Sequence, residues 1–86
     1  MAKMELQRGQ RVVNTFRGLK GSENPFLNRE AIIISKDWEG DDYYAFYPNC
    51  ALGWEPSDEE YEILEELGID EFGTMGYIFS SFYQEA

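Results

Sequence analysis

Histidine is absent from this sequence, and cysteine occurs only once, at Cys50. Histidine is the commonest general base of enzymes and the commonest metal ligand of proteins. Without it, neither Cys50 nor the pair Ser80–Ser81 has the partner that usually activates a nucleophile. Carboxylates are plentiful, but a solvated acidic surface accounts for them without an active site. We therefore expect a protein that is not an enzyme and that needs no cofactor.

The chain also lacks any long apolar run. No stretch approaches the roughly 20 apolar residues of a membrane-spanning helix, and residues 1–5 contain no signal-peptide pattern. A lone cysteine cannot form an internal disulfide, and a free thiol is typical of a reducing compartment. These absences predict a cytoplasmic protein without a membrane partner.

Lysine and arginine are missing from the second part of the chain. All seven bases lie within residues 1–36, together with three of the seventeen acids. Residues 37–86 contain the other fourteen acids and no base, so the net charge of −10 conceals a segment of +4 and a segment of −14. Nucleic-acid sites neutralise phosphates with lysine and arginine. Direct binding of DNA or RNA is therefore not expected.

Hydrophobic residues, in contrast, are well represented. They make up 43% of the 86 residues, and aromatic residues alone make up 16%. A few buried aromatic rings supply much of the stabilisation that a small core needs, and a chain of this length has room for one domain. We expect one acidic domain that spans residues 1–86.

Four runs rich in β-branched and aromatic residues predict strands. The run Ala31–Ile34 is apolar throughout, which indicates a strand buried on both faces. Turn-forming residues at 37–42 connect it to the next run, so these two strands are expected to form a hairpin. The four expected strands lie at about 10–17, 31–34, 43–47 and 77–83.

Residues 58–67 carry the signals of a helix. Ser57 lies three residues before Glu60, which matches a capping box. Gly68 follows as a left-handed cap. We therefore expect an α+β fold in the order β-β-β-α-β, with a small antiparallel sheet of about four strands and one helix packed on a face. The apolar stripe of the helix is formed by Tyr61, Leu64 and Leu67.

The acids of this helix are placed where they reduce its stability. Glu62 has acidic neighbours one turn away on both sides, and each such pair costs about 0.2–0.5 kcal/mol. Glu65 and Glu66 lie at the C-terminal end, where the helix dipole favours cations. A partner with a basic surface explains this arrangement, because complementary charge speeds and orients association. An acidic face kept for solubility is the alternative.

A second acidic cluster lies in the turn at 37–42. Its carboxylates are possible ligands for calcium or magnesium. However, Gly40 is the fourth residue from Asp37, whereas the twelve-residue calcium loop has its glycine at the sixth position. A polar hairpin turn accounts for the same residues, and we expect no metal site.

The chain resembles the small DNA-mimic inhibitors that phages encode against host defence, such as anti-restriction and anti-CRISPR proteins. The resemblance lies in its length, its lone cysteine and its acidic half without lysine or arginine. These inhibitors share no common fold, so the resemblance assigns no residue. It implies an inhibitor that acts in the cytoplasm of a host cell. Such an inhibitor binds the basic nucleic-acid groove of a host nuclease or of another nucleic-acid-binding protein.

The expected partner-binding residues are acids that stand in for phosphates and aromatic residues that anchor the interface. For each aromatic residue, a position in the core is an equally open alternative. The acids are Asp37, Glu39, Asp41 and Asp42 in the turn and Asp58, Glu59, Glu62, Glu65 and Glu66 in the helix, and the aromatic residues are Trp38, Tyr43 and Tyr44.

A protein-interaction or immunity-type module is the alternative function. Such a module binds one cognate partner through an aromatic patch. The strand expected at 77–83 offers one, because alternate residues of a strand share a face. Tyr77, Phe79 and Tyr83 would lie on one face of that strand, and Ile78 and Phe82 on the other.

Overall fold

The apolar run at 31–34 forms the centre of the sheet. The computed structural model describes residues 6–37, 40 and 42–86, and in it this run lies within β2 (Glu30–Lys36). All four side chains of the run are buried. β2 pairs with a strand on each side, and the side chains of the run belong to cores on both faces of the sheet, so the strand expected to be buried on both faces is confirmed.

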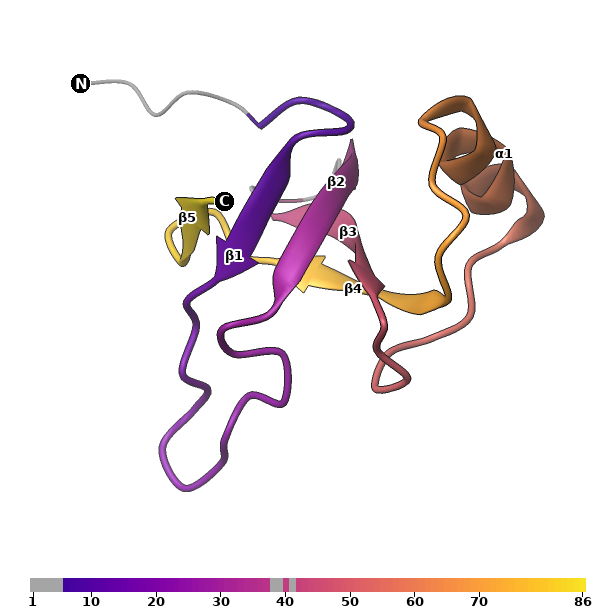
Figure 1. The fold of residues 1–86 in the computed structure, drawn as a ribbon. Helices are drawn as coiled ribbons and strands as arrows, with labels where there is room; N and C mark the ends of the chain where they lie inside the picture. Colours follow the sequence, from indigo (N-terminus) through magenta and orange to yellow (C-terminus); the bar gives the residue numbers. More distant parts are fainter. Residues whose placement is uncertain (1–5, 38–39, 41) are drawn as a thin grey trace.

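The described chain contains five strands and one helix (Figure 1), and every strand pairing is antiparallel. The expected α+β class is confirmed, and so is the hairpin of β2 and β3. The strand order across the sheet is β4-β3-β2-β1-β5. The other elements are β1 (Arg11–Asn14), β3 (Tyr43–Pro48), α1 (Asp58–Glu66), β4 (Gly73–Ile78) and β5 (Tyr83–Glu85).

The prediction of a single strand at 77–83 is wrong. β4 ends at Ile78, and a turn closed by the hydrogen bond from Phe82 N–H to Phe79 O (3.0 Å) separates it from β5. β4 pairs with β3 whereas β5 pairs with β1, so a straight strand cannot make both sets of bonds. The order is therefore β-β-β-α-β-β.

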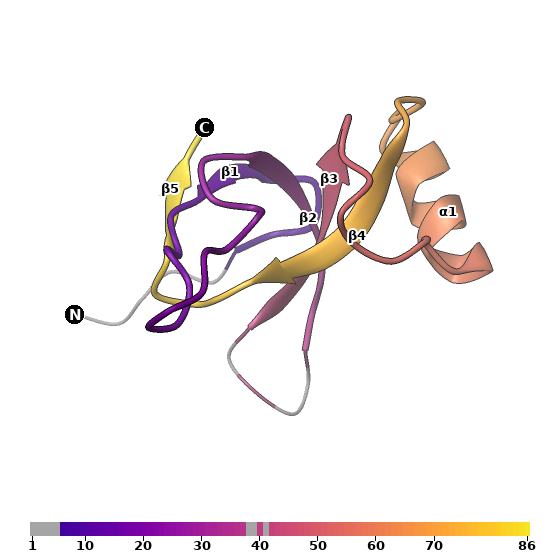
Figure 2. The ribbon, with the colours of Figure 1, turned by 90° about the horizontal axis from the view of Figure 1, so that it is seen from below.

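This short connection requires the sheet to curl. β4 and β5 form opposite edges of the sheet, and in a flat sheet of five strands the edges would be about 19 Å apart. A tight turn spans less than about 7 Å, so the edges must come close together, as in a partly open barrel. Figure 2 shows β4 passing from beside β3 across to β5.

A β-bulge in β2 contributes to this curvature. Ile33 lies opposite Ala45 and Ser35 lies opposite Tyr44, so Ile34 is an extra residue on β2. Bulges bend a strand and increase its twist. The Nε of Arg8 donates to the carbonyl oxygen of Ile34 at 2.8 Å, so one of the basic side chains has a structural role here.

Two cores lie on opposite faces of the curled sheet, because successive side chains of a strand point to opposite sides. Ala31 and Ile33 join the core enclosed by the curl, which also contains Val12 and Tyr47. On the outer face, α1 covers a second core. The buried members of that second core are Ile32, Ile34, Phe46, Leu64 and Met75.

The helix begins and ends as its sequence predicts. Ser57 N–H donates to Glu60 Oε1 at 2.9 Å, and Glu60 N–H donates to Ser57 Oγ at 3.3 Å, which completes the capping box. Gly68 has φ of 75°, the left-handed conformation expected of the cap. Leu64 is buried, but Tyr61 is 47% exposed and does not belong to the buried stripe.

Candidate functional site

The acids expected on the helix form one exposed surface. All five side chains are exposed, and α1 has no base in its last turn. Within the described part of the chain, none of the five takes part in an ion pair. Their charge is therefore available to a partner. The five residues are Asp58, Glu59, Glu62, Glu65 and Glu66.

Three further exposed acids extend this surface beyond the ends of α1. Glu55 precedes the helix, and Asp70 and Glu71 follow it. They are absent from the expected site. Their position within five residues of the helix ends is a signal that sequence reasoning had available, because chain segments that flank a helix lie near its ends.

Part of the charge separation along the sequence is also a separation in space. The loop between β1 and β2 and the helix α1 lie at different ends of the molecule in both Figure 1 and Figure 2. That loop, residues 15–29, contains Arg17, Lys20 and Arg29 but only one acid, Glu23. Arg8 lines a hollow with Glu59 and Glu60 at the N-terminal end of α1, although its Nε bonds to the Ile34 carbonyl.

Asp37 and Asp42, the described acids of the turn between β2 and β3, do not lie on α1. Asp37 N–H donates to the carbonyl oxygen of Asp42 at 2.9 Å, which closes the turn. The carboxylate of Asp42 accepts a hydrogen bond from Ser80 N–H at 3.4 Å, so it faces the turn at 79–82. The expected residues Trp38, Glu39 and Asp41 lie outside the described residues.

Tyr43 and Tyr44 have different environments. Tyr43 is only 6% exposed, and its hydroxyl accepts a hydrogen bond from Leu6 N–H at 3.1 Å. It is therefore a core residue and is not available as an anchor, since β3 turns this side chain into the enclosed core. Tyr44 points to the other face, where its ring lies 5.2 Å from that of Tyr77.

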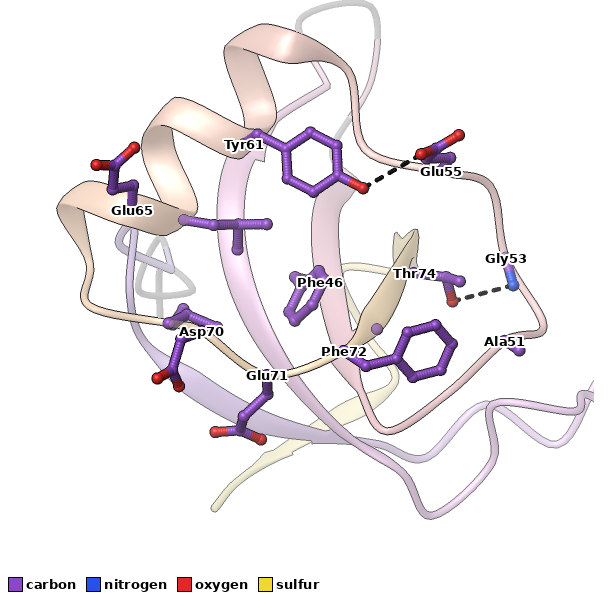
Figure 3. Close-up of a pocket in the computed structure, with 13 residues that line it drawn as sticks. Phe46, Ala51, Gly53, Glu55, Tyr61, Glu65, Asp70, Glu71, Phe72 and Thr74 are labelled. Carbon is purple, nitrogen blue, oxygen red and sulfur yellow. Dashed lines mark hydrogen bonds between the residues drawn. The ribbon is translucent and has the colours of Figure 1, made fainter.

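A pocket of about 660 Å³ opens between α1, β3 and the segment 69–74 (Figure 3). Phe46 and Leu64 form its apolar base, and Ile69 and Phe72 line it from the segment after the helix. Phe72 is 67% exposed. The close approach of the chain to Phe46 requires Gly73, because a Cβ there would overlap the Phe46 ring.

Of the residues that the structure describes, four acids and no lysine or arginine line this pocket. Figure 3 shows them arranged around Phe46, with Glu65 on α1, Asp70 and Glu71 on one side and Glu55 on the other. The pocket thus combines an apolar base with an anionic periphery. Of these four acids, the sequence predicted only Glu65 as a site residue.

Tyr61 connects α1 to the opposite wall of the pocket. Its hydroxyl donates to Glu55 Oε1 at 3.4 Å (Figure 3). Desolvation of the hydroxyl, followed by the negative charge of Glu55, raises the pKa of Tyr61 above its ordinary value. The hydrogen bond directs the Tyr61 hydroxyl across the pocket toward Glu55.

A second surface is aromatic. The rings of Tyr77 and Phe79 are parallel, with centroids 6.4 Å apart, and Trp54 lies 5.1 Å from Tyr77. Phe16 continues the row, because it contacts both Phe79 (4.8 Å) and Phe82 (5.0 Å). Trp54 and Tyr77 are each 40% exposed.

This aromatic row corrects the faces expected for residues 77–83. Tyr77 and Phe79 share a face as predicted, and Ile78 is buried. Phe82, however, lies on the side of Phe79, and Tyr83 packs against the enclosed core. The turn at 79–82 interrupts the strand, so the alternation of faces does not continue past it.

Beside the aromatic row, a hollow of about 480 Å³ lies between the loop after β1 and β4. The residues that line it are mostly apolar, and Leu19 and Leu52 are exposed there. The aromatic residues of this lining are Phe16, Phe26, Trp54, Tyr77 and Phe79.

No group of three or more metal-ligating side chains occurs in residues 6–37, 40 and 42–86. Within the same residues, no helix has both the length and the apolar character needed to cross a membrane. A scan against protein-family models, a search of curated proteins and a search of solved structures each gave no match.

Proposed function

We propose that this protein is an inhibitor that binds the basic groove of a nuclease or of another nucleic-acid-binding protein and so excludes the nucleic acid. The observation that carries the proposal is the exposed surface of α1, whose five carboxylates form no ion pair within the described residues. A basic groove offers the cations that these carboxylates lack.

The density of charge on α1 supports mimicry of a phosphate backbone. The helix has nine residues, and at about 1.5 Å per residue its five exposed carboxylates supply roughly one charge per 3 Å. A nucleic acid carries one charge per about 3.4 Å of each strand and one per about 1.7 Å of duplex. The helix therefore presents charge at a spacing close to that of one strand.

The energetic cost of this arrangement supports the same proposal. Like charges one turn apart and acids at the C-terminal end each disfavour the isolated helix. The described structure provides no cation that offsets these terms at the C-terminal end of α1. The basic surface of a partner would supply it.

Competition with DNA tests the proposal. The purified protein is added to a restriction endonuclease, a uracil-DNA glycosylase and a guide-loaded CRISPR nuclease, each bound to a fluorescent duplex. We expect displacement of the duplex from at least one of them, with a steep loss of inhibition as salt is added. The double variant Glu62→Lys, Glu66→Lys should not compete.

The matched control changes the net charge equally but leaves α1 intact. Glu23 and Glu85 are exposed and lie outside the helix, so the double variant Glu23→Lys, Glu85→Lys should still compete. Equal competition by the helix variant and the control variant would contradict the proposal, and so would an absence of competition with every enzyme tested.

A second candidate function is a protein-interaction module that binds one partner through the aromatic row. Tryptophan and tyrosine are enriched among the residues that dominate binding energy, and Trp54 and Tyr77 are partly exposed side by side. Binding through this surface would depend weakly on salt, which distinguishes it from binding through α1.

A further inference from the structure

The pocket beside α1 has a chemical character that a phosphate-like surface does not need. A surface that only mimics phosphates requires exposed carboxylates, whereas this pocket also has an apolar base of Phe46 and Leu64. Phe72 adds an exposed ring at its wall. The pocket therefore fits a ligand that is apolar along part of its length and positively charged elsewhere.

We propose that this pocket receives an arginine side chain of the basic partner. The inference rests on the proposed function and specifies which group of the partner is bound. The aliphatic stem of arginine would lie against Phe46 and Leu64, and its guanidinium would reach the carboxylates at the periphery. Among the described residues, no lysine or arginine lines the pocket, so none of their side chains neutralises the site.

Charge disfavours the other simple ligands. The four exposed carboxylates repel an anion, and a neutral apolar ligand would gain nothing from them. A small metal cation would make no use of the apolar base, and the described residues hold no group of three metal-ligating side chains. A long side chain with a cationic end uses both parts of the pocket.

Arginine fits better than lysine because of the two rings at the pocket. The guanidinium is planar and weakly hydrated, so it stacks on aromatic faces and binds carboxylates through two parallel hydrogen bonds. Tyr61 and Phe72 supply such faces, and the Tyr61 hydroxyl also hydrogen-bonds to Glu55. Lysine is a compact, strongly hydrated charge and gains less from either ring.

Three short peptides test the inference. Each has the same glycine–serine sequence around a central pair of arginine, lysine or citrulline residues, of which citrulline is the uncharged analogue of arginine. Binding to the intact protein is measured by fluorescence polarisation and located by amide NMR shifts. We expect the arginine peptide to shift the amides of Gly73 and Thr74, the lysine peptide to bind more weakly and the citrulline peptide to shift neither amide.

Two single variants locate the binding energy. Phe72 is largely exposed, so Phe72→Ala should preserve the fold, and we expect it to weaken binding of the arginine peptide about tenfold, because it removes one of the two aromatic faces of the site. Leu19→Ala, which removes an exposed apolar side chain from a different hollow, should change the affinity less than about twofold.

The outcomes separate this inference from the proposed function. If the arginine peptide shifts only amides on the outer face of α1 and Phe72→Ala has no effect, binding of arginine in the pocket is contradicted. The competition with DNA would be unaffected by that result. A lack of binding by the arginine peptide would also overturn the inference. Pocket binding of the arginine peptide without any competition with DNA would support the pocket and contradict the proposed inhibition.

Discussion

The side-chain amide of Asn14 donates a hydrogen bond of 2.9 Å to the Tyr47 hydroxyl inside the core that the curled sheet encloses. The hydroxyl in turn donates to the carbonyl oxygen of Tyr77 at 2.6 Å. Burial raises the pKa of Tyr47 to about 12, although the bond from Asn14 acts in the opposite direction. One protonated hydroxyl thus connects β1, β3 and β4.

The stability of the protein should depend on this proton at alkaline pH. The pKa of Tyr47 rises from 10.0 to about 12 on folding, so its contribution is complete below pH 10 and is lost as the pH rises through 12. Two pKa units correspond to roughly 2–3 kcal/mol. Urea unfolding of the protein and of Tyr47→Phe from pH 9 upward measures this loss.

At neutral pH, Tyr47→Phe should be less stable, because it leaves Asn14 and the Tyr77 carbonyl without their partner. The difference from the parent protein should shrink as the pH rises from 10 to 12. Tyr77→Phe, which alters a partly exposed ring, is the control. A difference for Tyr47→Phe that stays constant over this interval would contradict the prediction.

Removal of the helix cap should weaken the structure around the proposed site. Ser57→Ala removes the acceptor of the Glu60 N–H bond, and loss of such a cap costs about 0.5–2 kcal/mol. Thermal unfolding should show the decrease. Ser22→Ala, at an exposed turn, should change the free energy of unfolding by less than about 0.5 kcal/mol. Equal effects of the two substitutions would show that the cap contributes nothing.

Reversal of one helix charge should affect stability and binding in opposite directions. Glu66→Lys places a cation at the C-terminal end of α1, where the helix dipole favours it by about 0.3–1 kcal/mol. We expect a higher free energy of unfolding at low salt, a smaller gain at high salt and weaker inhibition of the partner. A variant that is both less stable and fully inhibitory would refute the hypothesis that the acids of α1 reduce stability and serve binding.

Truncation of the aromatic row should separate the two candidate functions. Trp54→Ala and Tyr77→Ala remove partly exposed rings but leave the acids of α1 unchanged. If α1 is the binding surface, affinity for the partner should fall less than about threefold and keep its salt dependence. A loss of about a hundredfold, typical of removing a dominant contact, would favour the protein-interaction module.

Features that depend on near neighbours in the sequence were predictable. The capping box joins Ser57 to Glu60, three residues away, and the left-handed cap at Gly68 follows from the helix end itself. The apolar run at 31–34 specifies a buried strand by its composition alone. The exposure of the acids on α1 also follows locally, because charged residues alternate there with a narrow apolar stripe.

Features that depend on distant segments were not predictable. The end of β4 at Ile78 is set by pairing with β3, and the start of β5 is set by pairing with β1, about 70 residues earlier in the chain. No local sequence pattern indicates that β4 pairs with β3 or that β5 pairs with β1. The face of Phe82 and the core position of Tyr83 follow from the same pairings.

The sequence by itself determined the helix with its caps, the central hairpin and the concentration of acids on α1, since each of these arises from residues within about one turn or one strand of each other. Only the tertiary structure decided that the sheet curls and that Tyr43 is buried. It also decided that Phe46, Glu55, Glu65 and Asp70, from four separate segments, surround one pocket. Such a site exists only where the packing of those segments brings them together.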